Sequence, residues 1–125
     1  EPGSLRMPHR NQHLPVVLTC SGASDVGELS DLVGRELSRT RVVQLECAAS
    51  VGAAKPDSLE RLRRAKTVLV IDGCASRCTR KMVEKAGIER SRHLDLGELG
   101  LSKGHSPATE VNVSRTVEAV KALLG

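Results

Sequence analysis

TVLVIDGCASRC, at residues 67–78, is the stretch that decides the fold. Its first five residues, Thr67–Ile71, form an uninterrupted apolar run rich in β-branched side chains, which is typical of a strand buried on both faces of a parallel sheet. The dipeptide Asp-Gly then predicts a tight turn. Two cysteines follow, four positions apart. We therefore expect a central strand whose carboxyl end leads directly to Cys74 and Cys78.

The other two cysteines repeat this placement. Cys20 closes an apolar run that begins at Pro15, and Cys47 closes a second run that begins at Val42. The carboxyl ends of neighbouring parallel strands share one edge of a sheet. The sequence thus predicts that four thiols distant along the chain converge at that edge.

The rest of the chain alternates strand-like and helix-like segments, which predicts a three-layer α/β sandwich. We expect a mostly parallel four-stranded sheet of the Rossmann or flavodoxin type, with strand order 2-1-3-4. The expected strands are 16–20, 42–47, 67–71 and 93–96. The expected helices are 26–39, 56–65, 78–86 and one that opens at Ser106-Pro107, and residues 48–55 are expected to form a loop.

The length of 125 residues suits one domain, which we place at residues 15–125. Residues 1–14 are polar and lack a hydrophobic period, so they are expected to form a mobile arm. Within this arm, residues 1–6 before Met7 resemble a remnant of an expression vector and are left out of the fold prediction.

The composition argues against several partners. The chain has no Phe, Tyr or Trp, and its net charge of +4 comes from 19 basic and 15 acidic residues. Single-strand nucleic-acid binding depends on aromatic stacking and on stronger basic charge, so no nucleic-acid partner is expected. The sequence contains neither an apolar run long enough to span a membrane nor a signal peptide. We therefore expect a cytoplasmic protein without a membrane partner.

A metal ion is the partner that the cysteines suggest. In a reducing compartment, four cysteines are more often metal ligands or redox groups than structural disulfides. Zinc takes four thiolates tetrahedrally, so the count predicts a zinc site formed by Cys20, Cys47, Cys74 and Cys78. An iron-sulfur cluster would use the same ligands.

Three other interpretations of the cysteines remain open. Each cysteine alone is equally consistent with a small buried apolar residue. Cys74 and Cys78 also suit a reversible disulfide at a helix start, as in a thiol-dependent redox enzyme or sensor. The turn after Cys20 resembles the loop of cysteine phosphatases, but Val26 stands where that loop needs arginine. Whether the protein is an enzyme, and which residues would be catalytic, the sequence leaves unknown.

Four further residues beside the cysteines are candidates for a supporting role. Ser21 and Gly22 open a small-residue turn before a predicted helix, where backbone N–H groups can bind an anion. Asp72 and Gly73 suit a tight turn, and the carboxylate of Asp72 can hold the following loop by accepting N–H hydrogen bonds.

The motifs around these residues resemble those of the DGC domain family, named for an Asp-Gly-Cys motif. The matching segments are 20–29, which has Asp25 where Asn is common, Cys47 with Ala53, 72–81 with its Asp-Gly-Cys, and 98–103 with Glu98, Leu101 and Lys103. Residues 48–51 depart from the family pattern. The resemblance covers about residues 16–103, implies four cysteine metal ligands, and implies no established reaction.

Overall fold

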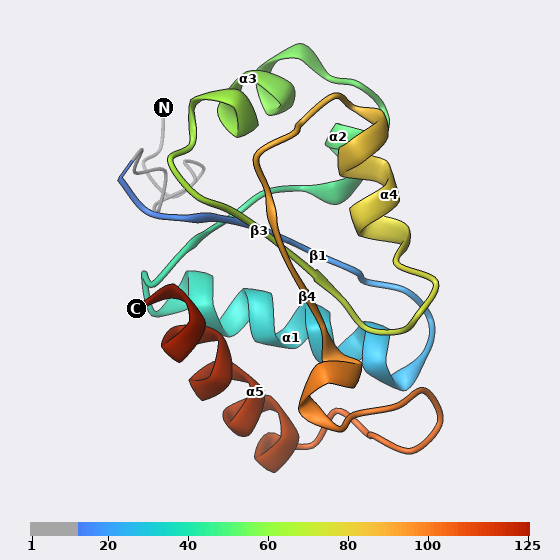
Figure 1. Ribbon diagram of the computed structural model, residues 1–125. Coiled ribbons are helices and arrows are strands. Elements are labelled where there is room, and N and C mark those ends of the chain that lie inside the picture. The colour runs from blue at the N-terminus through green and yellow to red at the C-terminus, as the bar shows by residue number, and fades with distance from the viewer. Residues whose placement is uncertain (1–12) are drawn as a thin grey trace, which may run out of the picture.

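The computed structural model describes residues 13–125, so the predicted arm at residues 1–14 lies almost entirely outside the described residues. The described chain forms an α/β fold around a four-stranded sheet in which all the paired strands are parallel (Figure 1). The strand order is β2-β1-β3-β4, which confirms the predicted order. The strands are β1 (Val16–Thr19), β2 (Gln44–Leu45), β3 (Val68–Asp72) and β4 (Arg92–Asp95).

The two central strands are buried throughout their length. Every residue of β1 and β3 is buried, as expected for strands covered on both faces. Thr19 of β1 lies beside Ile71 of β3, and Asp72 of β3 lies beside Asp95 of β4. This register brings the carboxyl ends of β1, β3 and β4 to one edge of the sheet.

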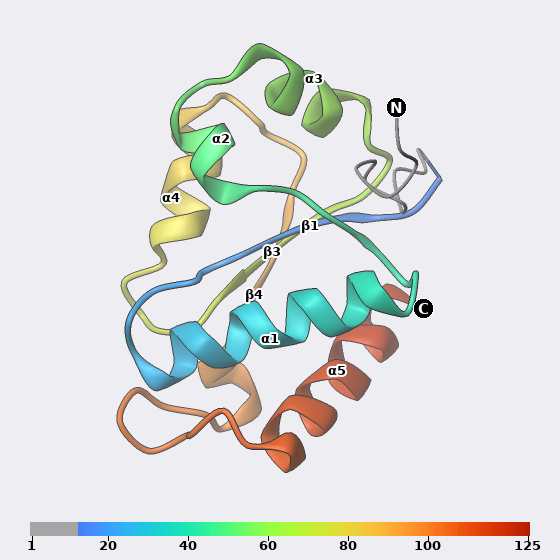
Figure 2. The ribbon, with the colours of Figure 1, turned by 180° about the vertical axis from the view of Figure 1, so that it is seen from behind.

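Helices cover both faces of the sheet, and on each face they pack with the strands around a separate apolar cluster. Figures 1 and 2 show α1 and α5 on one face, with α2, α3 and α4 on the other. Val17, Leu69 and Ile71 pack toward the first layer, whereas Leu18 and Val70 pack toward the second. The helices are α1 (Asp25–Arg39), α2 (Ala48–Gly52), α3 (Pro56–Arg64), α4 (Cys78–Lys85) and α5 (Glu110–Leu124), and a 3-10 helix, η2 (Leu96–Leu99), follows β4.

Three predicted boundaries are wrong. The expected loop at residues 48–55 contains α2, whose Gly52 packs closely against the Met82 side chain of α4. The second strand is only two residues long. The last helix begins at Glu110 with Thr109 as its N-cap rather than at Ser106-Pro107, because Ser106 is buried and its N–H donates to Asp25.

Gly73, directly after β3, packs closely against the backbone at the start of α1. A Cβ built on Gly73 would lie 2.6 Å from the backbone oxygen of Val26 and 3.0 Å from the backbone nitrogen of Gly27. Only a residue without a side chain leaves room for this contact, since backbone atoms cannot turn aside as a flexible side chain does. The glycine of the Asp-Gly-Cys motif therefore sets how closely the start of α1 approaches the carboxyl end of β3.

We expect Gly73→Ala to lower the free energy of unfolding by about 2–3 kcal/mol, because overpacking against backbone forces the two segments apart. Urea denaturation followed by far-UV circular dichroism measures the loss. Gly97→Ala is the matched control, since a Cβ at Gly97 meets nothing within 4 Å. Equal stability of the two variants would contradict the assignment.

Candidate functional site

The four cysteines lie at or just beyond the strand ends, as predicted. Cys20 directly follows β1, and its N–H donates to the carbonyl of Ile71 in β3. Cys47 lies two residues beyond β2, and Cys74 lies two residues beyond β3. Cys78 is the first residue of α4. All four thiols are free, with Cys20 and Cys74 half-buried and Cys47 and Cys78 exposed.

The four sulfur atoms do not form a ready-made metal site. Within residues 13–125, no group of three or more His, Cys, Asp or Glu side chains is arranged to hold a metal ion. Cys74 packs against the apolar cluster beneath α1 and α5, whereas Cys78 is exposed at the start of α4. The donors fit zinc in type and in number. Ligation by all four would require the loops that carry them to change conformation.

The loop between β3 and α4 is held at both ends. The Asp72 carboxylate accepts hydrogen bonds from the backbone N–H groups of Thr79 at 2.9 Å and of Arg80 at 3.0 Å. The predicted loop-holding role of Asp72 is confirmed. Arg77, just before α4, has a φ of 52° in the left-handed region, which disfavours a residue with a Cβ.

Cys47 is the thiol for which the structure gives the clearest electrostatic environment. It is the N-cap residue of α2. Hydrogen bonds from the hydroxyl and then the backbone N–H of Ser50 lower the pKa of the Cys47 thiol below its ordinary value. The thiol opens onto a groove of about 380 Å³, whose lining includes Arg35 and Arg61. We call this space the Cys47 groove.

A partly buried ion pair supports the wall of the Cys47 groove. Arg61 donates from Nε to Glu46 Oε1 at 2.7 Å and from Nη2 to Glu46 Oε2 at 3.0 Å. The Glu46 side chain is only 5% exposed. Two parallel hydrogen bonds fix both groups, so the segment that carries Cys47 is attached to α3. The sequence gives no signal for this pair, because its members lie on different elements.

The turn after Cys20 is short and internally bonded. The N–H of Gly22 points to the Cys20 Sγ at 3.4 Å, and Ser24 Oγ accepts from Gly27 N as the N-cap of α1. The Ser30 hydroxyl donates to the carbonyls of Cys20 and Gly27. Anion binding by Ser21 and Gly22 stays a prediction.

Asp25 makes a contact that sequence reasoning missed. Its carboxylate accepts hydrogen bonds from the backbone N–H of Gly104 at 2.9 Å and of Ser106 at 3.0 Å, about eighty residues further along the chain. These bonds lower the pKa of Asp25. The turn at residues 102–106 is thereby fixed to the start of α1. The chain distance explains why no local pattern predicts it.

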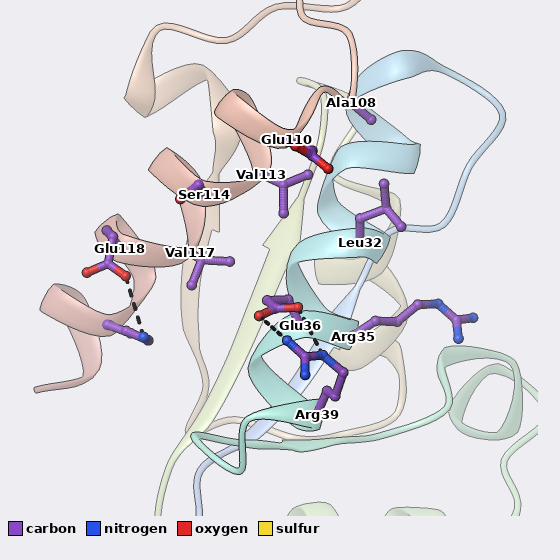
Figure 3. A pocket seen from close by; sticks show the side chains of 11 residues that line it. Leu32, Arg35, Glu36, Arg39, Ala108, Glu110, Val113, Ser114, Val117 and Glu118 are labelled. Atoms are coloured by element: carbon purple, nitrogen blue, oxygen red, sulfur yellow. Dashed lines mark hydrogen bonds and ion pairs between the residues drawn. The ribbon is translucent and has the colours of Figure 1, made fainter.

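A separate groove of about 470 Å³ lies between α1 and α5 and contains no cysteine. Figure 3 shows its charged side chains at the rim, where Glu36 pairs with Arg39 and Glu118 pairs with Lys121. Leu32 and Val113 face the space between the helices in the same view. Its chemistry is that of a helix-packing seam, so the cysteine edge remains the candidate site.

Comparison with known proteins identifies the class. Residues 16–120 match the DGC domain, so the chain belongs to the DGC domain family. A relative in Pseudomonas aeruginosa, the anaerobic and virulence modulator AnvM, is 33% identical over 97 residues, which cover 78% of this chain and 74% of the relative. No solved structure matches this chain. Among the described residues, no helix is both long and apolar enough to cross a membrane.

The hydrogen bonds of Asp25 lead to a prediction about how the stability of the fold depends on pH. Because the pKa of Asp25 is lower in the folded state, its contribution is present above the unfolded-state pKa of about 3.9 and is lost as pH falls through the folded-state pKa. Asp25→Asn should lower the melting temperature at about pH 7, and the difference from wild type should shrink near about pH 3. Thermal unfolding of both proteins at the two pH values measures the difference in melting temperature. Glu89→Gln, at an exposed carboxylate, is the control, and a difference independent of pH would refute the assignment.

Proposed function

We propose that this DGC protein binds one zinc ion through Cys20, Cys47, Cys74 and Cys78, and that binding serves metal handling, sensing or stability. The observation that carries the proposal is the placement of four free thiols after three adjacent parallel strands. Membership of the DGC family supports it, since the family motifs include the cysteines. When bound, zinc supplies a divalent charge that stabilises the four thiolates.

The described arrangement supports binding that is coupled to loop movement. Cys47 and Cys78 are exposed, and they lie at the N-cap of α2 and at the first residue of α4. Cys20 and Cys74 stay closer to the core. We infer that the two inner cysteines mark the position of the site, and that the outer two close over the ion. Such a change in conformation on binding suits a sensor better than a permanent structural ion.

The name of the Pseudomonas relative points the same way. That protein is named as an anaerobic and virulence modulator, which indicates regulation rather than storage. For this chain, we propose that occupancy of the cysteine site changes the surface at the carboxyl edge of the sheet. The resulting difference between metal-free and metal-bound forms would be the regulatory signal.

The test is elemental analysis and zinc titration of protein purified without chelator. We expect about one zinc per chain, with no visible colour, and a release of protons on binding. Affinity should fall as pH decreases, since thiols have a reference pKa of about 8.5 and must lose protons to ligate. Each single Cys→Ser change should weaken binding roughly a hundredfold or more, because even residues outside the ligand set commonly matter 10–100-fold.

The matched control is Ser76→Ala, in the same exposed loop as Cys74 and Cys78 but not among the proposed ligands. It should bind zinc like the wild type. A brown protein with iron and sulfide would replace zinc by an iron-sulfur cluster. Metal-free protein with a titratable disulfide between Cys74 and Cys78 would instead establish the thiol redox alternative.

Thiol chemistry at Cys47 is a second candidate function, favoured by one observation. Cys47 is exposed, and Ser50 lowers its pKa. A larger thiolate fraction raises reactivity toward electrophiles and oxidants at neutral pH. Thiol chemistry at Cys47 requires one reactive cysteine, whereas the proposed zinc site requires four cysteine ligands.

Metal-free protein should therefore react with iodoacetamide first at Cys47, as mapped by mass spectrometry of partly alkylated samples. Ser50→Ala should slow alkylation of Cys47 several-fold at about pH 7, because the pKa of the thiol rises once the hydroxyl donor is lost. Alkylation of Cys78, also exposed, provides the internal control. A rate at Cys47 unaffected by Ser50→Ala would remove this candidate.

A further inference from the structure

Helix α5 presents one complete face to solvent. Figures 1 and 2 both show the helix at the outside of the molecule. Val117 and Val120 pack into the apolar cluster beneath α1 and α5. With 3.6 residues per turn, the opposite side of the helix is formed by exposed residues at positions 111, 115, 118 and 122. We call this side, which consists of Val111, Arg115, Glu118 and Ala122, the outer α5 face.

The spacing of the outer α5 face is that of a helix that packs against another helix. Its members follow one another at intervals of four, three and four residues, so they form a single stripe along α5. The same alternation marks the contact stripe of coiled coils. Val111 is 66% exposed and is the more exposed of the two large apolar side chains that the described residues leave in solvent. Ala122, at the other end, is small enough for a larger side chain to pack on it.

The charged residues between these ends lack strong partners within the chain. The side chain of Arg115 makes no ion pair or hydrogen bond among residues 13–125. Glu118 pairs with Lys121 at 3.4 Å, and both side chains are exposed. Exposed pairs of this kind contribute little stability. Arg115 and Glu118 are therefore available to charged groups on another molecule.

The outer α5 face is complementary to itself when one copy is reversed. If a second copy of α5 lies antiparallel across it, Val111 meets the second copy's Ala122, and Arg115 meets the second copy's Glu118. A two-fold axis repeats both contacts, as an isologous interface requires. The interface then has apolar contacts at its ends and two ion pairs in its middle. A parallel arrangement would place Arg115 beside Arg115 and Glu118 beside Glu118, so repulsion disfavours it.

The charges on the flank of α5 agree with the antiparallel direction. Glu110 and Lys121 both line the groove between α1 and α5, so they lie on one side of α5 and near opposite ends of it. Glu110 makes no ion pair within the described part of the chain. In the antiparallel arrangement, Glu110 of each copy comes near Lys121 of the other. Opposite charges therefore meet on the flank as well as in the middle of the stripe.

We propose that this protein forms a homodimer through the outer α5 face, with the two α5 helices antiparallel. The contact is confined to one helix of each copy, about 22 Å long at about 1.5 Å per residue. An interface of this size belongs to the weak, transient class, so the population of dimer depends on protein concentration. The four cysteines lie outside α5. The dimer and the proposed zinc site are thus separate proposals, and either can fail alone.

Sedimentation equilibrium of the full chain, at concentrations up to about 1 mM, measures the association. A reductant keeps the exposed Cys47 and Cys78 from forming intermolecular disulfides. The wild type should self-associate, and added salt should weaken the association because it screens the ion pairs. Arg115→Glu and Glu118→Arg should each raise Kd about tenfold or more, since two attractive pairs become repulsive. Lys81→Glu, the same charge reversal at an exposed lysine of α4, should associate like the wild type.

Mixing the two charge variants is the decisive measurement. Each variant alone places like charges together in the middle of the stripe, whereas one Arg115→Glu chain and one Glu118→Arg chain match at both central pairs. The mixture should therefore form a heterodimer at concentrations at which each variant alone is a monomer. The variant that carries both changes should self-associate again. Circular dichroism checks that every variant is folded. A wild type that is monomeric at all these concentrations, or a mixture no more associated than its components, would overturn the proposal.

Discussion

The parallel pairing of β1 with β3 is the constraint on which the rest of the molecule depends. Both strands are buried on both faces, so a slip of one residue would turn the whole apolar set of a strand to the wrong layer. The pairing of Thr19 with Ile71 is thereby fixed. Since the chain lacks aromatic residues, Val, Leu and Ile must fill both apolar clusters. The candidate site depends on that register, because it places Cys20 beside the end of β3.

The sequence predicts the sheet well because strands buried on both faces leave a strong signal. The run at 67–71 identifies the central strand, and the strand order follows from consecutive βα units. The misplaced elements have weak local signals. The segment 48–52 is rich in Ala and Gly and becomes helical where Gly52 meets Met82. Ser106 resembles a helix start, but its N–H is used by Asp25.

In the candidate site too, features set by neighbouring residues are predictable from the sequence, whereas contacts between distant segments are not. The sequence places each cysteine at a strand end, and the structure confirms those positions. The directions of the sulfur atoms depend on how loops pack, which no spacing rule contains. Asp72 is predictable because its partners are seven and eight residues away. The Glu46–Arg61 pair is not predictable, since it forms only when β2 and α3 are brought together by the fold.

The contact of Asp25 with the turn at 102–106 also bears on the order of folding. The loop that it closes contains most of the domain, and closing a long loop is entropically unfavourable until intervening elements have docked. We therefore expect these hydrogen bonds to form after the sheet and α1 are in place. Interactions that are absent from the transition state slow unfolding without speeding folding. On this basis we expect the Asp25 carboxylate to slow unfolding of the domain, while the folding rate depends on the pairing of the central strands.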